Sequence, residues 1–162
     1  IQTFEKRNAQ TTFNLTRYID SEQRWEDYAA DFQLYRVYGY STYTPKEGFS
    51  REETTYGGLA AEKWVCRENP DVWFMVVNLQ TDSHEDAVQW ALSAGGSDYA
   101  LIEDKRGGVL GGNADNTALL SIGFQQREIN NDIYGVIYHY PLAENDNLGV
   151  YVKVMADEFR TE

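Results

Sequence analysis

Few residues in this sequence have the types and spacing that catalysis requires. The chain has two histidines, His84 and His139, and one cysteine, Cys66, so a thiolate or histidine-rich metal cluster does not fit. The pair His84-Glu85 lacks the second histidine of the H-E-x-x-H zinc motif, and no nucleophile elbow of the form G-x-S-x-G occurs. We therefore expect no catalytic residues, no enzymatic activity and no resident organic cofactor.

Four acidic groups, "ENPD", "NADN", "ENDN" and "IEDK", could supply the oxygen ligands that Ca²⁺ prefers, although none has EF-hand spacing. They can be read as solvated turns. They can also be read as half-sites for a cation shared between neighbouring subunits, with Asp115 and Asp146 as candidate ligands. The glycine-rich "GGVLGG" at 107–112 lacks the GK[ST] ending of a phosphate loop, so we expect it to be a loop between strands.

Composition narrows the classes of partner. A length of 162 residues predicts one domain. The formal net charge of −12, from 26 acidic and 14 basic residues, argues against nucleic-acid binding by the body of the chain, which would need clustered Lys and Arg. No apolar run approaches the length of roughly 18 residues that a membrane span needs, so we expect no membrane partner.

The aromatic residues occur mostly in alternating runs, which is typical of half-buried strands. "TTFNLTRYI" at 11–19 is expected to be the first strand. Trp25, Tyr28, Ala29 and Phe32 then fall at i, i+3, i+4 and i+7, which predicts a short helix capped by the residues at 20 or 21. The stretch "DFQLYRVYGYSTYTP" at 31–45 resumes alternation and ends at a proline, so it is expected to be a strand.

The remaining chain continues the pattern. We expect a long loop at 46–69 that contains one short strand at 60–68, and then a buried strand at 71–80. A helix is expected at 83–96, capped by Ser83 and facing inward with Val88, Ala91 and Leu92. Further strands are expected at 97–105, 117–126, 131–141 and 148–159. Seven or eight strands with two short helices indicate an all-β sandwich, a class that includes jelly rolls.

The segment from Phe13 to Pro45 resembles the single jelly-roll capsid proteins of small icosahedral viruses. The closest likeness is to circular, Rep-encoding single-stranded DNA viruses and to tombus-like or satellite RNA viruses. Their first strand leads through a short helix into a strand of the form Y-R-I/V that ends at a proline. The residues of this sequence that match are Phe32, Tyr35, Arg36, Val37 and Pro45.

The resemblance implies one jelly-roll domain over 1–162, with eight antiparallel strands and two short helices in the connections. It implies a structural protein that self-assembles into a T=1 or larger icosahedral shell, about 60 copies or a multiple of that number. The shell would form inside the host cell, become the virion, enclose the viral genome and meet a host receptor. The first 20 residues are not arginine-rich, so genome contact is expected to be weak or to depend on a basic arm upstream of Ile1.

The aromatic residues can be interpreted in two ways, one for the capsid protein and one for an alternative function. In the capsid interpretation, one face of the 31–45 strand lies in the core and the other lies at a subunit contact or the inner surface, with Arg36 paired to a carboxylate. In the alternative, the chain is a carbohydrate- or receptor-binding β-sandwich. Its sugar platform would draw on Trp25, Trp64, Trp73, Trp90 and the twelve tyrosines. The directions in which these rings point distinguish the two.

Overall fold

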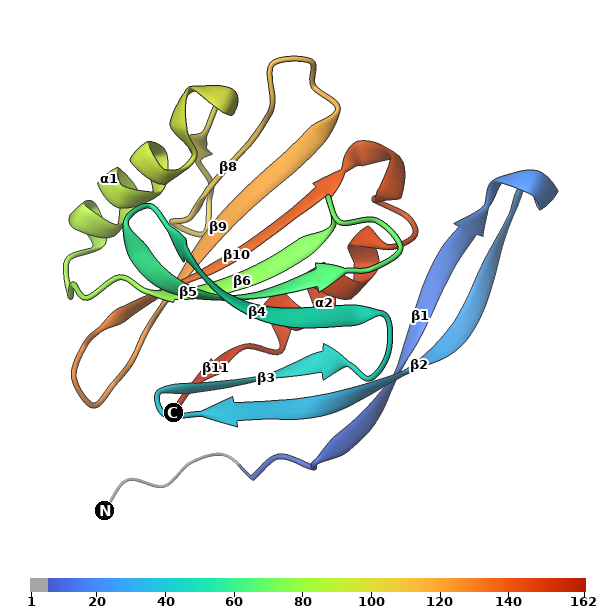
Figure 1. The fold of residues 1–162 in the computed structure, drawn as a ribbon, viewed down its shortest axis with the longest axis horizontal. Helices are drawn as coiled ribbons and strands as arrows, with labels where there is room; N and C mark the ends of the chain where they lie inside the picture. The colour runs from blue at the N-terminus through green and yellow to red at the C-terminus, as the bar shows by residue number, and fades with distance from the viewer. Residues whose placement is uncertain (1–5) are drawn as a thin grey trace.

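The computed structural model describes residues 6–162 as a mostly β protein with two antiparallel sheets and two α-helices (Figure 1). The smaller sheet has the order β1 (Gln10–Ile19), β2 (Arg24–Val37), β3 (Tyr40–Pro45) and β11 (Arg160–Thr161). The larger sheet has the order β4 (Phe49–Tyr56), β5 (Leu59–Cys66), β6 (Trp73–Asn78), β10 (Ile133–Pro141), β9 (Ala118–Gln126), β8 (Val109–Gly112) and β7 (Ile102–Glu103). The helices are α1 (His84–Ala94) and α2 (Gly149–Asp157), and single 3₁₀ turns lie at Asp20–Glu22, Gly96–Asp98 and Leu142–Glu144.

The larger sheet is covered on both faces. Along β6, Phe74 and Val76 belong to one buried cluster, which also holds residues of the smaller sheet and α2. Their neighbours Met75 and Val77 belong to a second cluster, which holds the inner face of α1. Successive side chains of a strand point to opposite faces, so a strand covered on both sides must be apolar throughout. This explains why the β6 sequence does not alternate.

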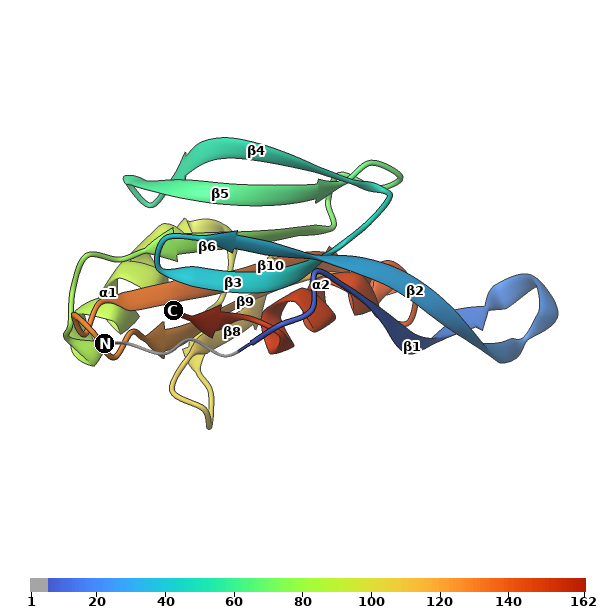
Figure 2. The ribbon, with the colours of Figure 1, turned by 90° about the horizontal axis from the view of Figure 1, so that it is seen from below.

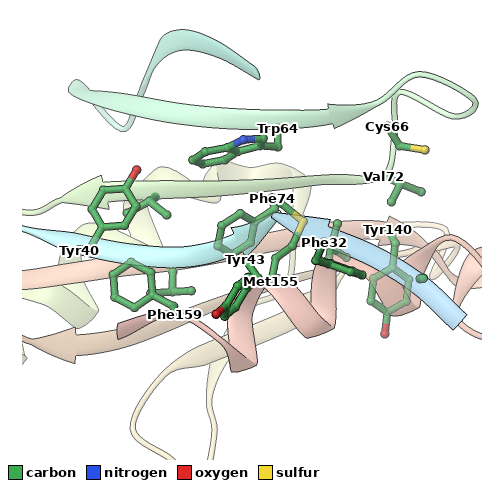
Figure 3. Close-up of a cluster of buried hydrophobic side chains, with 14 of the residues drawn as sticks. Phe32, Tyr40, Tyr43, Trp64, Cys66, Val72, Phe74, Tyr140, Met155 and Phe159 are labelled. Carbon is green, nitrogen blue, oxygen red and sulfur yellow. The ribbon is translucent and has the colours of Figure 1, made fainter. Parts of the chain in front are cut away.

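The cluster between the two sheets is rich in aromatic rings (Figure 3). Phe32 from β2, Phe74 from β6 and Phe159, which follows α2, are all fully buried. The Phe159 ring stacks on that of Tyr40 with centroids 5.2 Å apart. Pairs of this kind add about 0.5–1.5 kcal/mol each beyond the area that they bury. The aromatic content therefore serves largely to join the two sheets.

The helix expected over Trp25–Phe32 is wrong, because this segment is the first half of β2. Tyr28, Ala30 and Phe32 also alternate, and this period-two face is the one that turns toward the core. The sequence fits both periods. The antiparallel pairing of β1 with β2 along ten residues decides for the strand.

The strand expected at 148–159 is also wrong, because its first part forms α2. Val150, Val152 and Val154 alternate as in a strand, but the fully buried set is Val152, Met155 and Phe159, which has helical spacing. β-branched residues favour strands only where a pleated neighbour is present. Here the segment packs across β10 and β3 instead.

Two loops expected from glycine and polar residues contain strands. The stretch 46–69 folds into the β4–β5 hairpin: β5 confirms the short strand expected at 60–68, and the part expected to be loop forms β4. The glycine-rich 107–112 contributes β8 to the larger sheet, while the expected strand at 97–105 contains only the short β7.

The helix expected at 83–96 is confirmed as α1. The Ser83 hydroxyl accepts a hydrogen bond from the main-chain N–H of Asp86 at 3.2 Å, and Gly95 follows the last helical turn. Val88 and Ala91 are buried against the sheet, whereas Leu92 is half-buried. Over residues 6–162, neither helix has the length and apolar character needed to cross a membrane.

The sandwich architecture of two antiparallel sheets agrees with the fold class expected from the sequence, at that level of detail. The described residues form eleven strands, and most neighbours in each sheet are also neighbours in the chain. A jelly roll has eight strands joined by Greek-key connections. The pairing seen here does not supply that connectivity, so the jelly roll stays a prediction from the resemblance.

Candidate functional site

The β1–β2 hairpin extends beyond the rest of the molecule, as both views of the ribbon show (Figures 1 and 2). At its tip a single 3₁₀ turn is followed by Gln23, which adopts a left-handed conformation. The side chains of Tyr18 and Trp25 pair next to this turn, with ring centroids 5.2 Å apart. Trp25 is 57% exposed, the highest value for any tryptophan in the chain. The hairpin thus presents a large apolar ring at a projecting end.

The two faces of this hairpin differ in chemistry. On the inner face, Phe13 packs edge-on against Phe32 with centroids 5.0 Å apart, and Leu15 is buried. On the outer face the Thr12 hydroxyl donates to Asp31 at 2.9 Å and the Thr16 hydroxyl donates to Asp27 at 2.8 Å. The hairpin is therefore anchored to the core by one face and presents an acidic, hydroxyl-bearing face to solvent.

The outer edge of β1 offers free main-chain groups. The N–H of Tyr18 donates to the carbonyl oxygen of Asp146 at 3.1 Å and so points away from β2. Alternate residues of an antiparallel strand direct their N–H and C=O groups to the same side. The main-chain groups of Thr12, Asn14 and Thr16 therefore also point away from β2. None of these groups has a hydrogen-bond partner among residues 6–162.

β1 also lacks the features that normally protect an edge strand from pairing. Its ten residues contain no proline and no glycine, and Arg17 is its only charged residue. The β4 edge of the larger sheet is different, because β4 carries the consecutive charged residues Arg51, Glu52 and Glu53. Charged side chains on an edge oppose strand addition, whereas an unprotected edge is a template for another chain. Strand addition is thus far better suited to β1 than to β4.

The residues of the capsid-like motif lie close to this hairpin. Phe32 is in the core, directly opposite Pro45 in the β2–β3 register. Arg36 forms an ion pair, with its Nε 2.8 Å from the Glu162 carboxylate, which confirms the expected pairing with a carboxylate. Tyr35 and Val37 are half-buried and pack against the inter-sheet cluster. The five residues hold β2 and β3 in place rather than forming an exposed patch.

Tyr35 leads to a polar cluster that links the two sheets. Its hydroxyl donates to the Glu62 carboxylate, as does the hydroxyl of Tyr40 at 2.6 Å, and Arg51 contacts the same carboxylate at 2.6 Å. Burial raises the pKa of Tyr35 to about 12, with a further contribution from its bond to Glu62. For Glu62 itself, burial raises the pKa, but the three donors outweigh it and lower the pKa below 4.5. Glu62 is therefore a stably ionised link between the sheets.

The histidines occupy different settings. The Nδ1 of His139 is 2.6 Å from the carbonyl oxygen of Asp71, which can only accept, so Nδ1 carries the proton. Its Nε2 lies 2.7 Å from the Tyr99 hydroxyl, within hydrogen-bond distance, and the ring stacks on Trp73. His84 starts α1 and contacts Phe124 edge-on. Both ring nitrogens of His139 thus lie within hydrogen-bond distance of groups of the protein itself.

Asp115 and Asp146, the candidate Ca²⁺ ligands, lie in separate turns. Asp115 is in the connection between β8 and β9, and Asp146 precedes α2, where its Oδ1 accepts from the Asn145 amide at 3.0 Å. Within the described part of the chain, no group of three or more His, Cys, Asp or Glu side chains is placed to hold a metal ion. A cation shared between subunits would draw ligands from two chains, so that expectation stays a prediction.

The four tryptophans do not form a common platform. Trp64 is buried at 4% exposure between the sheets, while Trp25 stands at the hairpin tip. Trp90 donates its Nε1–H to the Gly57 carbonyl at 3.0 Å, and Trp73 is stacked on a histidine. A linear sugar platform made of these rings is therefore absent from the described residues.

Sequence reasoning missed the two features that dominate this surface. The free β1 edge was hidden because the following segment was expected to be a helix, which would have left no hairpin. The Glu62 cluster was missed because its partners Tyr35, Tyr40 and Arg51 come from other strands, although a short strand at 60–68 that contains Glu62 was expected.

No protein-family model matches the chain, and no curated protein matches it.

Proposed function

We propose that this protein is a non-enzymatic structural subunit that assembles with copies of itself, in the role of a viral capsid protein. The observation that supports this best is the unprotected β1 edge on a projecting, core-anchored hairpin. Strand addition at such an edge supplies main-chain hydrogen bonds whatever the side chains are. The match of Phe32, Tyr35, Arg36, Val37 and Pro45 to the capsid motif supports the shell and its location in the virion, although the short helix that the motif includes is part of strand β2 here.

The hairpin offers two different contacts. Two copies of β1 can pair antiparallel about a two-fold axis, which is the isologous arrangement. In such a pairing Arg17 lies opposite the other end of the partner strand, so the two like charges do not meet. An isologous contact closes as a dimer, and a shell needs at least one more type of contact. The exposed Trp25 at the tip supplies a candidate, because aromatic anchors dominate protein interfaces.

The jelly-roll form of the sandwich, the icosahedral T=1 shell and assembly in the host cell belong to this proposal through the resemblance. Contact with the genome is proposed to be weak or to depend on a basic arm, because a net charge of −12 repels a polyanion. A host receptor is a further proposed partner. Ca²⁺ at subunit contacts, through Asp115 and Asp146, is proposed to bridge carboxylates of neighbouring chains.

Light scattering with negative-stain microscopy on the purified protein, with its native N-terminus, tests the proposal. Uniform particles on the order of 20 nm across are expected if about 60 sandwich domains close by symmetry. A monomer that persists across pH, salt and Ca²⁺ concentrations would rule out the shell.

A further inference from the structure

A pocket of about 600 Å³ lies between the turn that joins β2 to β3 and the strands β4, β5, β6 and β10. This volume is within the range of small-ligand sites, about 300–1,000 Å³. Its lining combines aromatic rings, amides and charges of both signs. The residues used below are Tyr38, Asn78, Arg127, Asn130 and Asp132.

Arg127 is the unusual member of this lining, because it is a guanidinium only 2% exposed. Its Nε donates to the main-chain carbonyl oxygen of Glu162, and its Nη1 is 3.5 Å from the Tyr38 hydroxyl. It forms no ion pair with a carboxylate side chain anywhere in residues 6–162. A guanidinium has five N–H donors, and a buried cation is costly unless it is paired. Arg127 therefore has N–H donors left for a ligand group that enters the pocket.

The second arginine of the pocket, Arg51, is already paired with carboxylates of the protein. Arg51 is paired with Glu62 and lies 3.4 Å from Glu53. Asp132 lines the same pocket as Arg127, and its Oδ2 accepts from the amides of Asn78 at 3.3 Å and Asn130 at 3.0 Å. A single carboxylate matches one guanidinium, whereas a dianionic phosphate would be repelled by the neighbouring acidic groups.

The remaining groups suit hydroxyls. Each amide uses one of its two N–H donors on Asp132, and the second Oδ of that carboxylate accepts no hydrogen bond from the described residues. A carboxylate oxygen that accepts and neighbouring amide N–H groups that donate can together bind adjacent hydroxyl groups of a sugar. Tyr38 is 88% exposed, and its ring covers the Arg127 guanidinium at 4.7 Å on one side. The other face of that ring is free to pack on the apolar face of a sugar.

We propose that this pocket binds an acidic sugar, a hydroxyl-rich ring that bears one carboxylate. The carboxylate pairs with Arg127, the hydroxyls bind Asp132 and Asn130, and the ring packs on Tyr38. The site is separate from the β1 edge, so the proposal does not depend on self-association.

Isothermal titration of the protein with glucuronic acid and with glucose tests this. Because a charge-assisted pair is about twice as strong as a neutral hydrogen bond, glucuronate should bind at least about tenfold more tightly than glucose. Arg127→Lys, which keeps the charge but loses the planar fork, should weaken glucuronate binding. Tyr38→Ala, which removes the stacking ring at an exposed position in the turn between β2 and β3, should weaken binding of both sugars.

Ile102→Ala serves as the matched control, since Ile102 is 67% exposed on β7, at the far edge of the larger sheet. It should leave binding of both sugars unchanged. The proposal is overturned if glucuronate does not bind, if glucose binds equally well, or if Tyr38→Ala has no effect on binding. A folded Arg127→Lys variant with unchanged affinity for glucuronate would overturn it as well.

Discussion

At the residue scale, Glu62 joins the two sheets through side chains from both of them. Tyr35 and Tyr40 approach it from the smaller sheet, and Arg51 approaches from the larger. Its pKa is lowered in the folded protein, so its contribution to stability is present above about pH 4.5 and is lost as the pH falls through the folded pKa.

Glu62→Gln should therefore destabilise the protein by about 1–3 kcal/mol at neutral pH, because charge-assisted hydrogen bonds are lost. The difference from the wild type should shrink in acid, since protonation removes the same charge from Glu62. Urea unfolding of both proteins at about pH 7 and about pH 3 measures this. An equal difference at both pH values would contradict the ionised link.

Both the backbone conformation and the neighbouring Tyr134 require a glycine at position 39. It has φ +102°, and a Cβ there would lie 2.1 Å from the hydroxyl oxygen of Tyr134. Gly39→Ala should destabilise by about 2 kcal/mol or more, from backbone strain and this overlap. Gly48→Ala is the matched control, because Gly48 has φ +89° with nothing within 4 Å and so meets only the strain.

Adding Tyr134→Phe to Gly39→Ala should restore part of the lost stability, because it removes the overlapping oxygen. Thermal unfolding of the three variants checks the order. If Gly39→Ala were no worse than Gly48→Ala, the close approach of Tyr134 would be refuted.

At the scale of elements, the β1–β2 hairpin is the largest difference between the sequence expectation and the structure. The helix at α1 could be predicted because its cap, acidic first turn and terminal glycine agree with its apolar spacing. The segment at 24–32 has two competing periods, and only the long-range partner β1 selects one. The prediction for α2 was wrong for the same reason, because the alternation of Val150, Val152 and Val154 fits a strand unless the neighbouring elements are known. Pairing partners and pocket walls drawn from distant segments, such as Arg127 beside Tyr38, cannot be read from local patterns.

Two neighbouring alanines distinguish strand from helix in β2. Ala30 is buried and Ala29 is exposed, whereas the helix would have turned Ala29 inward beside Trp25 and Phe32. Ala30→Gln should cost about 2–3 kcal/mol through overpacking and an unsatisfied amide, and Ala29→Gln should change stability by about 0.5 kcal/mol or less. Chemical denaturation of the two variants measures both changes. A larger loss of stability in Ala29→Gln than in Ala30→Gln would support the helix instead of the strand.

At the scale of the whole molecule, the charge of −12 opposes association of identical copies. Added NaCl should therefore increase the assembled fraction by screening this repulsion. Ca²⁺ at matched ionic strength should increase it further if Asp115 and Asp146 share a cation across subunits. Sedimentation velocity in the two salts measures the difference. An identical response to the two salts would mean that screening alone drives the association, and would contradict a cation shared between subunits. If Ca²⁺ increased the assembled fraction of Asp146→Asn as much as that of the wild type, the shared cation would also be contradicted.

The most direct test of self-association through β1 is the mass distribution of Asn14→Pro, measured by light scattering beside the wild type. The N–H of Asn14 points away from β2, so proline removes a donor from the free edge and leaves the β1–β2 ladder intact. Asn14→Thr keeps that N–H and is the matched control. We expect the wild type and Asn14→Thr to form the same large species and Asn14→Pro to form much smaller ones. If folded Asn14→Pro assembles like the wild type, or if the wild type is a monomer, the β1 edge is not the assembly contact.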